Sequence, residues 1–220
     1  MTAGAEPEAA VFDLDGTLIL SEHRNRAVWA AFFARRGLHL DDELAGALTG
    51  RRGVDSLAEL AHLFPGEAPE ELLDEVWRTE ATAPDLPEIG AVPGAAGYVT
   101  RLAAAGVPLA LVTSARQPYV DRALAGLGLG DSFAVLVTAD DVGTGKPDPE
   151  GYLRAAARLG VAAADAVGFE DSPAGVAAVR AAGMRCVAVA STVDPAALGA
   201  ADLVVPSLEG LPWPPLPPRA

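Results

Sequence analysis

The chain contains one cysteine and one lysine, and both scarcities limit what it can do. A single cysteine, Cys186, forms no disulfide within the chain and excludes a metal site built from cysteine ligands. It lies in the apolar run Arg185–Val189, which indicates a small buried side chain rather than a reactive thiol. The lysine is Lys146, and the other basic residues among the sixteen are arginines.

The sequence has no apolar run long enough to cross a bilayer, although 50% of its 220 residues are apolar. Residues 1–10 include Glu6 and Glu8 and no basic residue before the first apolar stretch, which argues against a secretory signal. We therefore expect a cytoplasmic protein. The length allows one α/β core with an accessory piece, and not two large domains.

Positive charge is scarce, because the formal net charge is −14. An acidic surface repels nucleic acid and anionic lipid, so neither is an expected partner. The same surface repels a phosphorylated substrate. Any phosphate chemistry therefore needs a local source of positive charge, and Lys146 is a candidate for it.

Short apolar runs alternate with alanine-rich helical patterns over most of the chain. Strands are expected at residues 9–12, 109–112, 135–137, 164–168 and 186–190, with 203–205 as a candidate sixth. Helices are expected at residues 95–105, 118–127, 149–159 and 173–182. This alternation predicts an α/β fold in which a parallel sheet carries helices on both faces.

Residues 20–88 break this rhythm, because they look helical and contain no strand pattern. An apolar stripe at i, i+4 spacing favours a helical core over a ligand site, and it consists of Val28, Trp29, Phe32 and Phe33. We expect a helical cap at 20–88, inserted into a core made of residues 1–19 and 89–220. The proline-rich end, residues 211–220, is expected to be extended or disordered.

Polar side chains follow four of the expected strands, at the ends where open parallel sheets bind ligands. They are Asp13 and Asp15 after the first strand, Thr113 and Ser114 after the second, Lys146 beyond the third, and Glu170 and Asp171 after the fourth. One polar residue at a strand end means little. A much stronger indication of function is an edge that carries acids, hydroxyls, a lysine and a further acid pair together.

Carboxylates crowded at this edge cannot all ionise without cost, because each like-charge pair at 4 Å costs about 1–4 kcal/mol near a protein surface. Either their pKa values rise or a divalent cation lies among them. An all-oxygen site suits a hard cation, and Mg²⁺ is the usual one beside a phosphate. The cation and Lys146 would together supply the missing positive charge.

The strand-end residues fit a two-step phosphoryl transfer. Asp13 would be the nucleophile that forms an aspartyl-phosphate. Asp15 would protonate the leaving oxygen and later deprotonate the attacking water. Lys146 would bridge the phosphate and Asp13.

The remaining strand ends would hold the phosphate and the metal. Thr113 and backbone amides near Ser114 would bind the phosphoryl oxygens. Asp171, aided by Glu170, would hold the metal. Arg116 and Gln117, beside Ser114, either line the phosphate pocket or open the next helix.

Four segments carry a resemblance to a known family: residues 11–18 (VFDLDGTL), 113–114 (TS), 145–149 (GKPDP) and 168–175 (GFEDSPAG). They resemble the four motifs of the haloacid dehalogenase superfamily, in order, and the similarity extends to about Leu208. The resemblance implies a Rossmann-like core and Mg²⁺ held by a carboxylate oxygen of Asp13, the backbone carbonyl of Asp15, and Asp171. The helical insert resembles the cap of the β-phosphoglucomutase-like branch.

Departures from the family patterns narrow the expected activity. Dehalogenases lack the second aspartate of the first motif, so Asp15 favours phosphoryl chemistry. The cap has no lysine, which argues against the phosphonate hydrolases, and Asn25 stands where β-phosphoglucomutase has a histidine. Residues 50–55 (GRRGVD) are similar to glycerol-phosphate and 2-deoxyglucose-phosphate phosphatases. On that alignment Arg52 matches a substrate-side arginine, although Arg51 could serve instead.

The sequence therefore predicts a Mg²⁺-dependent phosphatase that hydrolyses a small sugar or polyol phosphate. A phosphosugar mutase is the first alternative, and a catalytically silent phospholigand-binding protein is the second. The expected partner is a small phosphorylated metabolite, without nucleic acid or membrane. We expect a monomer or a weak dimer.

Overall fold

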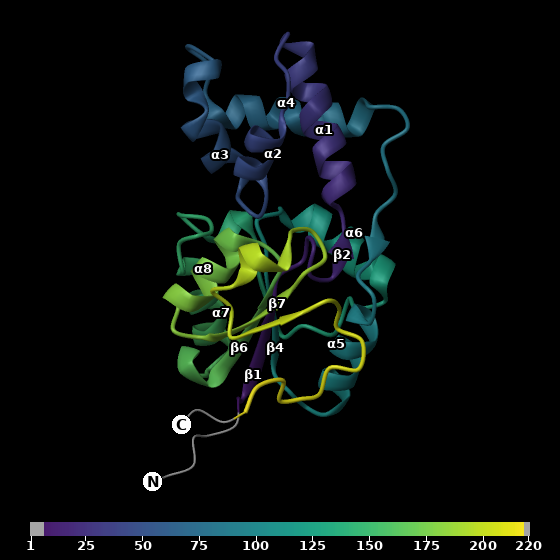
Figure 1. Ribbon diagram of the computed structural model, residues 1–220, viewed down its shortest axis with the longest axis vertical. Helices are drawn as coiled ribbons and strands as arrows, with labels where there is room; N and C mark the ends of the chain where they lie inside the picture. Colours follow the sequence, from purple (N-terminus) through teal and green to yellow (C-terminus); the bar gives the residue numbers. More distant parts are fainter. Residues whose placement is uncertain (1–6, 218–220) are drawn as a thin grey trace.

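The computed structural model describes residues 7–217 and confirms the α/β fold (Figure 1). Six parallel strands form the central sheet in the order β5-β4-β1-β6-β7-β8. Their bounds are β1 Ala9–Phe12, β4 Leu109–Val112, β5 Val135–Val137, β6 Ala166–Glu170, β7 Arg185–Val189 and β8 Leu203–Val205. Residues 1–6, which bear on the expected lack of a secretory signal, and the last residues of the proline-rich end lie outside the described residues.

Two strands differ from the expected bounds. β6 begins at Ala166 instead of residue 164 because Ala163–Asp165 first forms a 3-10 turn, and it continues to Glu170. β7 begins one residue early, at Arg185, and holds the buried Cys186 as expected. Glu170 is therefore the last residue of its strand, whereas the expected strand ended two residues earlier, at residue 168.

Helices cover both faces of the sheet. Their bounds are α5 Ala95–Ala104, α6 Gln117–Leu127, α7 Glu150–Leu159 and α8 Pro173–Ala181. Successive strand side chains point to opposite faces. In β1, Ala10 and Phe12 pack in the cluster that includes α5 and α6, whereas Ala9 and Val11 pack in the cluster that includes α7 and α8.

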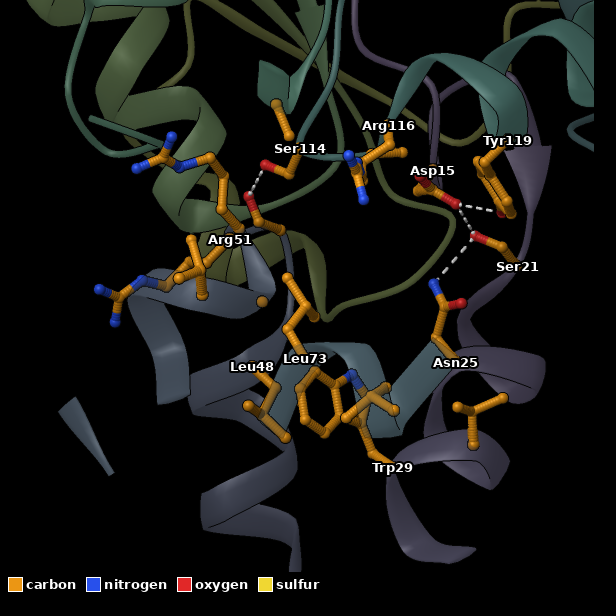
Figure 2. Close-up of a pocket in the computed structure, with 18 of the residues that line it drawn as sticks. Asp15, Ser21, Asn25, Trp29, Leu48, Arg51, Leu73, Ser114, Arg116 and Tyr119 are labelled. Atoms are coloured by element: carbon orange, nitrogen blue, oxygen red, sulfur yellow. Dashed lines mark hydrogen bonds between the residues drawn. The ribbon is translucent and has the colours of Figure 1, made fainter. Parts of the chain in front are cut away.

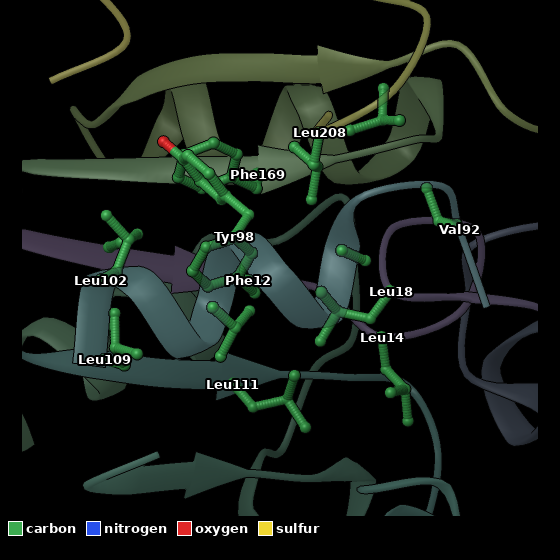
Figure 3. Close-up of a cluster of buried hydrophobic side chains, with 14 of the residues drawn as sticks. Phe12, Leu14, Leu18, Val92, Tyr98, Leu102, Leu109, Leu111, Phe169 and Leu208 are labelled. Carbon is green, nitrogen blue, oxygen red and sulfur yellow. The ribbon is translucent and has the colours of Figure 1, made fainter. Parts of the chain in front are cut away.

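An aromatic cluster lies behind the carboxyl edge of the sheet (Figure 3). The ring of Phe12 stacks on that of Phe169, with 4.4 Å between centroids. Tyr98 from α5 meets both rings edge-on, at 6.1 and 5.6 Å. Phe12 directly precedes Asp13 and Phe169 directly precedes Glu170, so this packing sets the positions of two strand ends relative to each other.

Residues between β1 and α5 form a helical layer above the carboxyl edge of the sheet (Figure 1). The helices are α1 Glu22–Arg35, α2 Asp42–Leu48, α3 Gly53–Glu59 and α4 Pro69–Thr82, and they enclose a hydrophobic cluster of their own. Phe32 and Phe33 are fully buried in it. Within residues 7–217, no helix combines the length and the apolar character needed to span a bilayer.

A short antiparallel ribbon marks where the chain enters and leaves this layer. β2, Ile19–Leu20, pairs with β3, Gly90–Ala91. We propose that this ribbon bounds the cap, close to the limits of 20 and 88 expected from the sequence.

The C-terminal segment lacks helix and strand, as expected, but it is packed rather than disordered. Residues 211–217 were expected to be extended or disordered, but they pack against the core without forming a helix or strand. Leu211 and Leu216 are buried, and Trp213 packs against the same cluster as Phe12. A proline-rich sequence predicts the absence of helix and strand, but it does not predict disorder. The apolar residues between the prolines can still be buried against the core.

Leu216→Ala tests this packing. We expect it to lower the free energy of unfolding by about 2–4 kcal/mol, because it removes a buried side chain. Urea denaturation measures the change, and Leu153→Ala is the control, because Leu153 is 44% exposed. Equal effects of the two substitutions would show that the segment is not packed in solution.

Candidate active site

Asp13 is the first residue beyond β1, near the middle of the carboxyl edge of the sheet. Its backbone N–H donates to the carbonyl of Phe169 at 2.9 Å. The chain then turns at Gly16, where φ is +83°, a region that favours glycine. A Cβ at Gly16 would lie 1.9 Å from Oδ2 of Asp171, so glycine also allows Asp171 to approach the loop.

Lys146 places a buried ammonium group beside Asp13. Its Nζ lies 2.5 Å from Oδ1 of Asp13 and 2.5 Å from Oε1 of Glu170, and donates to the carbonyl of Val112 at 3.3 Å. Burial alone would lower the pKa of Lys146, but the attraction of both carboxylates outweighs it and raises the pKa. The lysine is therefore a fixed cation in the working pH range.

Glu170 accepts hydrogen bonds on both of its carboxylate oxygens. Its Oε1 accepts from the hydroxyl of Tyr152 at 2.8 Å. Its Oε2 accepts from the backbone N–H of Asp171 at 3.0 Å and from the N–H and hydroxyl of Ser172 at 3.3 and 3.1 Å. Both oxygens are engaged, so a metal ion would compete with these donors for the lone pairs of Glu170.

The acidic residues form a cluster suited to a cation. Asp13, Glu170 and Asp171 each offer a carboxylate oxygen within 4.8 Å of the others. Burial raises the pKa of Asp13 to about 8, although Lys146 opposes the shift. Burial, followed by the charges of Glu170 and Asp13, raises the pKa of Asp171 well above its usual range. These all-oxygen donors, with more negative charge than one ammonium balances, fit a hard divalent cation such as Mg²⁺.

Asp15 lies at the cavity with one oxygen held by two donors (Figure 2). The hydroxyls of Ser21 and Tyr119 donate to Oδ1 at 2.5 and 2.8 Å, and Asn25 donates to Ser21 at 3.4 Å. Burial raises the pKa of Asp15, and the two hydroxyl donors oppose the shift. Sequence analysis did not single out Tyr119, which lies 104 residues from Asp15 and is marked only by this contact.

Two other contacts were also missed. The hydroxyl of Thr192, beyond β7, donates to Oδ2 of Asp171. The hydroxyl of Tyr152, in α7, donates to Glu170. Neither residue belongs to a strand-end motif, so no sequence signal pointed to them.

Thr113 and Ser114 follow β4 next to Lys146. Thr113 is buried, and its Oγ1 accepts from the backbone N–H of Ala115 at 3.1 Å. The hydroxyl of Ser114 donates to the carbonyl of Gly50 in the cap at 3.3 Å (Figure 2). The two expected phosphate-binding positions are therefore beside the acidic cluster, and Ser114 also contacts the cap.

Of Arg116 and Gln117, the structure brings only Arg116 to the cavity. Its guanidinium donates to Asp140 at 3.0 Å and lies over the ring of Trp77, 4.6 Å from the centroid. Gln117 instead donates to Asp121 at 2.7 Å, one turn along α6. Gln117 thus opens the helix, which was the simpler of the two interpretations of the sequence.

A cavity of about 1210 Å³ separates the cap from the core. Asp13, Asp15 and Asp171 line it from the core, and Trp29, Leu48, Leu73, Arg51 and Arg52 line it from the cap. Figure 2 shows Asp15 across the cavity from Trp29, Leu48 and Leu73. Its volume exceeds the roughly 300–1,000 Å³ of typical small-molecule pockets. A small metabolite can therefore reach the acidic cluster from this cavity.

Gly175→Ala tests the packing around Glu170. A Cβ at Gly175, in the first turn of α8, would lie 1.8 Å from Cδ of Glu170, so we expect a loss of about 1–3 kcal/mol in the free energy of unfolding. Gly97→Ala in α5 is the control, because nothing lies within 4 Å of its Cβ, and it should stabilise the protein by up to about 1 kcal/mol. If urea denaturation gives both variants the same stability, Glu170 does not occupy this position.

Comparisons with known proteins agree with the geometry. The family model described as "Hydrolase: haloacid dehalogenase-like hydrolase" matches residues 7–183. The validoxylamine A 7'-phosphate phosphatase of Streptomyces hygroscopicus subsp. limoneus is 43% identical, covering 94% of this chain and 97% of the relative. Hexitol phosphatase A of Escherichia coli is 38% identical over 90% of each chain. The crystal structure of CbbY from Rhodobacter sphaeroides in complex with phosphate superposes with a TM-score of 0.79 at 27% identity, covering 93% of this chain and 96% of that chain. The chain belongs to the haloacid dehalogenase-like hydrolases.

Proposed function

We propose that the protein is a Mg²⁺-dependent phosphatase that hydrolyses a small sugar or polyol phosphate through an aspartyl-phosphate on Asp13. The observation that carries this proposal is the buried contact of Lys146 with Asp13 and Glu170, at 2.5 Å each, in the cluster that includes Asp171. A carboxylate nucleophile, a fixed ammonium and metal-binding acids thus share one site. Relatives that are 43% and 38% identical are named as phosphatases of a validoxylamine phosphate and of hexitol phosphates, which supports a phosphate ester as substrate.

In the first step Asp13 attacks the phosphorus of the ester. Lys146 donates to Oδ1 of Asp13, which leaves Oδ2 free to form the new oxygen–phosphorus bond. As that bond forms, the bond between phosphorus and the ester oxygen breaks, and Asp15 gives its proton to the leaving oxygen. The burial that raises the pKa of Asp15 favours the protonated form that this step requires.

In the second step a water molecule attacks the phosphorus of the aspartyl-phosphate. Asp15, now a carboxylate, takes a proton from the water as the bond to Asp13 breaks. The products are the free alcohol and inorganic phosphate, and Asp13 is regenerated.

The phosphoryl group is held by donors around Asp13. The hydroxyl of Thr113, backbone N–H groups near Ser114 and the ammonium of Lys146 would bind its oxygens. Mg²⁺, held by Asp13, Asp171 and the backbone carbonyl of Asp15, would neutralise charge on the phosphoryl oxygens.

The cap favours a substrate with one phosphate. Its four arginines that line the cavity each pair with a carboxylate: Arg24 with Glu80, Arg26 with Asp42, Arg51 with Glu59, and Arg52 with Asp55. A second phosphate on the cap side would compete with these carboxylates for the guanidinium groups. A mutase that works through a bisphosphate is therefore less well supported than a phosphatase.

Asp13→Asn tests the nucleophile. We expect phosphate release to fall by roughly three orders of magnitude or more, because an amide does not form the covalent intermediate. The assay uses Mg²⁺ and a panel of hexitol phosphates, glycerol phosphates, hexose 6-phosphates and β-glucose 1-phosphate. Asp131→Asn, at an exposed position, is the control. Retained turnover in Asp13→Asn would reject the covalent mechanism, and glucose 6-phosphate formed from β-glucose 1-phosphate without phosphate release would favour the mutase.

Removal of divalent cations tests the metal. We expect EDTA to abolish turnover and added Mg²⁺ to restore it. Mg²⁺ should also raise the melting temperature of the wild type by binding the folded state, and should do so less in Asp171→Asn. Full turnover in EDTA would reject the metal requirement.

A further inference from the structure

Arg52 connects the cap to the loop that carries Lys146. It lies just before α3, and only 9% of its surface is exposed. Its Nη1 donates to the carbonyl of Val142 and its Nη2 to the carbonyl of Gly143, both at 2.7 Å. These carbonyls lie four and three residues before Lys146, on the core side of the cavity.

Asp55, in the first turn of α3, completes this contact. It accepts from Nε and Nη2 of Arg52 at 2.8 and 2.7 Å. Its Oδ2 also accepts from the backbone N–H of Gly145 at 3.2 Å. The Arg52–Asp55 pair thus binds three backbone groups in the four residues that precede Lys146.

The guanidinium of Arg52 has little capacity left for a substrate. An arginine has five N–H donors. Four of them are directed to Asp55, Val142 and Gly143. The two-pronged contact by which arginine usually binds a phosphate is therefore already used within the protein.

The loop has room for the Arg52–Asp55 pair because residue 145 is glycine. A Cβ at Gly145 would lie 2.6 Å from Oδ2 of Asp55 and 2.7 Å from Cγ of Arg52. Gly145 is not among the glycines with positive φ, so its own backbone conformation would accept a side chain. The cap side chains alone exclude a larger residue there.

We propose that the Arg52–Asp55 pair lets the closed cap position the loop of Lys146, so that Arg52 is a positioning residue rather than a substrate ligand. This inference rests on the proposed function, in which Lys146 holds the nucleophile. Closure of the cap adds three hydrogen bonds to the loop, and an open cap loses them. The ammonium is then fully positioned only when the cavity is covered.

Steady-state kinetics on two esters test the proposal. Arg52→Lys keeps the positive charge but loses the planar guanidinium and its several N–H donors. Gly145→Ala adds a Cβ to the loop, which displaces the Arg52–Asp55 pair while both of its side chains stay unchanged. We expect both variants to lower kcat about tenfold on the best polyol phosphate and on p-nitrophenyl phosphate, with KM changed by less than about twofold. Arg78→Ala, at an exposed position of α4, is the control. A rise in KM confined to the polyol phosphate would instead make Arg52 a substrate ligand and overturn the proposal.

Chemical labelling of Lys146 provides a readout that needs no turnover. Lys146 is the only lysine, so reductive methylation modifies it and the N-terminal amine, which serves as the internal reference. We expect Lys146 in Arg52→Lys and Gly145→Ala to react at least about fivefold faster relative to that reference than in the wild type or Arg78→Ala, because it is only 6% exposed with the pair in place. Urea denaturation first confirms that each variant is folded.

The labelling result separates this inference from the proposed function. Unchanged labelling in folded Arg52→Lys and Gly145→Ala overturns the positioning role even if the enzyme is a phosphatase. A wild type that releases no phosphate from any ester overturns the proposed function, and faster labelling in the variants would still support the contact between the cap and the loop.

Discussion

The buried ion pairs of Lys146 with Asp13 and Glu170 are the interaction on which the site depends. The chain has a net charge of −14, and its single lysine lies beside a cluster of three carboxylates. The third carboxylate, next to those of Asp13 and Glu170, belongs to Asp171. One cation does not balance three buried acids, and burying unbalanced charge is costly. The site therefore favours further positive charge, which a divalent cation would supply. With such a cation bound beside Lys146, the site would offer a phosphate positive charge on an otherwise repellent protein.

The parallel sheet makes this concentration of charge possible. Asp13 follows β1, Thr113 follows β4, and Glu170 ends β6, and these three strands are neighbours in the sheet. Each side chain is carried by a rigid element rather than by a long loop. The stacked rings of Phe12 and Phe169 fix β1 and β6 directly behind the acids. The core thus holds Asp13, Thr113 and Glu170 in place before any ligand binds, which favours electrostatic stabilisation without reorganisation.

The cap contacts the proposed acid–base group and the loop of the ammonium. Ser21, at the start of α1, donates to Asp15. The Arg52–Asp55 pair binds the loop of Lys146. Movement of the cap would therefore change the surroundings of the proposed acid–base group and of the ammonium together. In this arrangement the cap covers the cavity and also completes the geometry of the core.

The sequence by itself determined the α/β class and the residues that meet at the edge of the sheet. Asp13, Asp15, Lys146 and Asp171 were predicted because parallel topology brings successive strand ends together, whatever the details of packing. The contacts of Arg52 with Val142, of Tyr119 with Asp15, and of Trp213 with the core were decided only by the tertiary structure. The first two join residues 90 and 104 positions apart and follow no strand or helix period. Periodicity reports which face of an element is buried, but only the packed chain determines which distant side chain a free donor or acceptor meets.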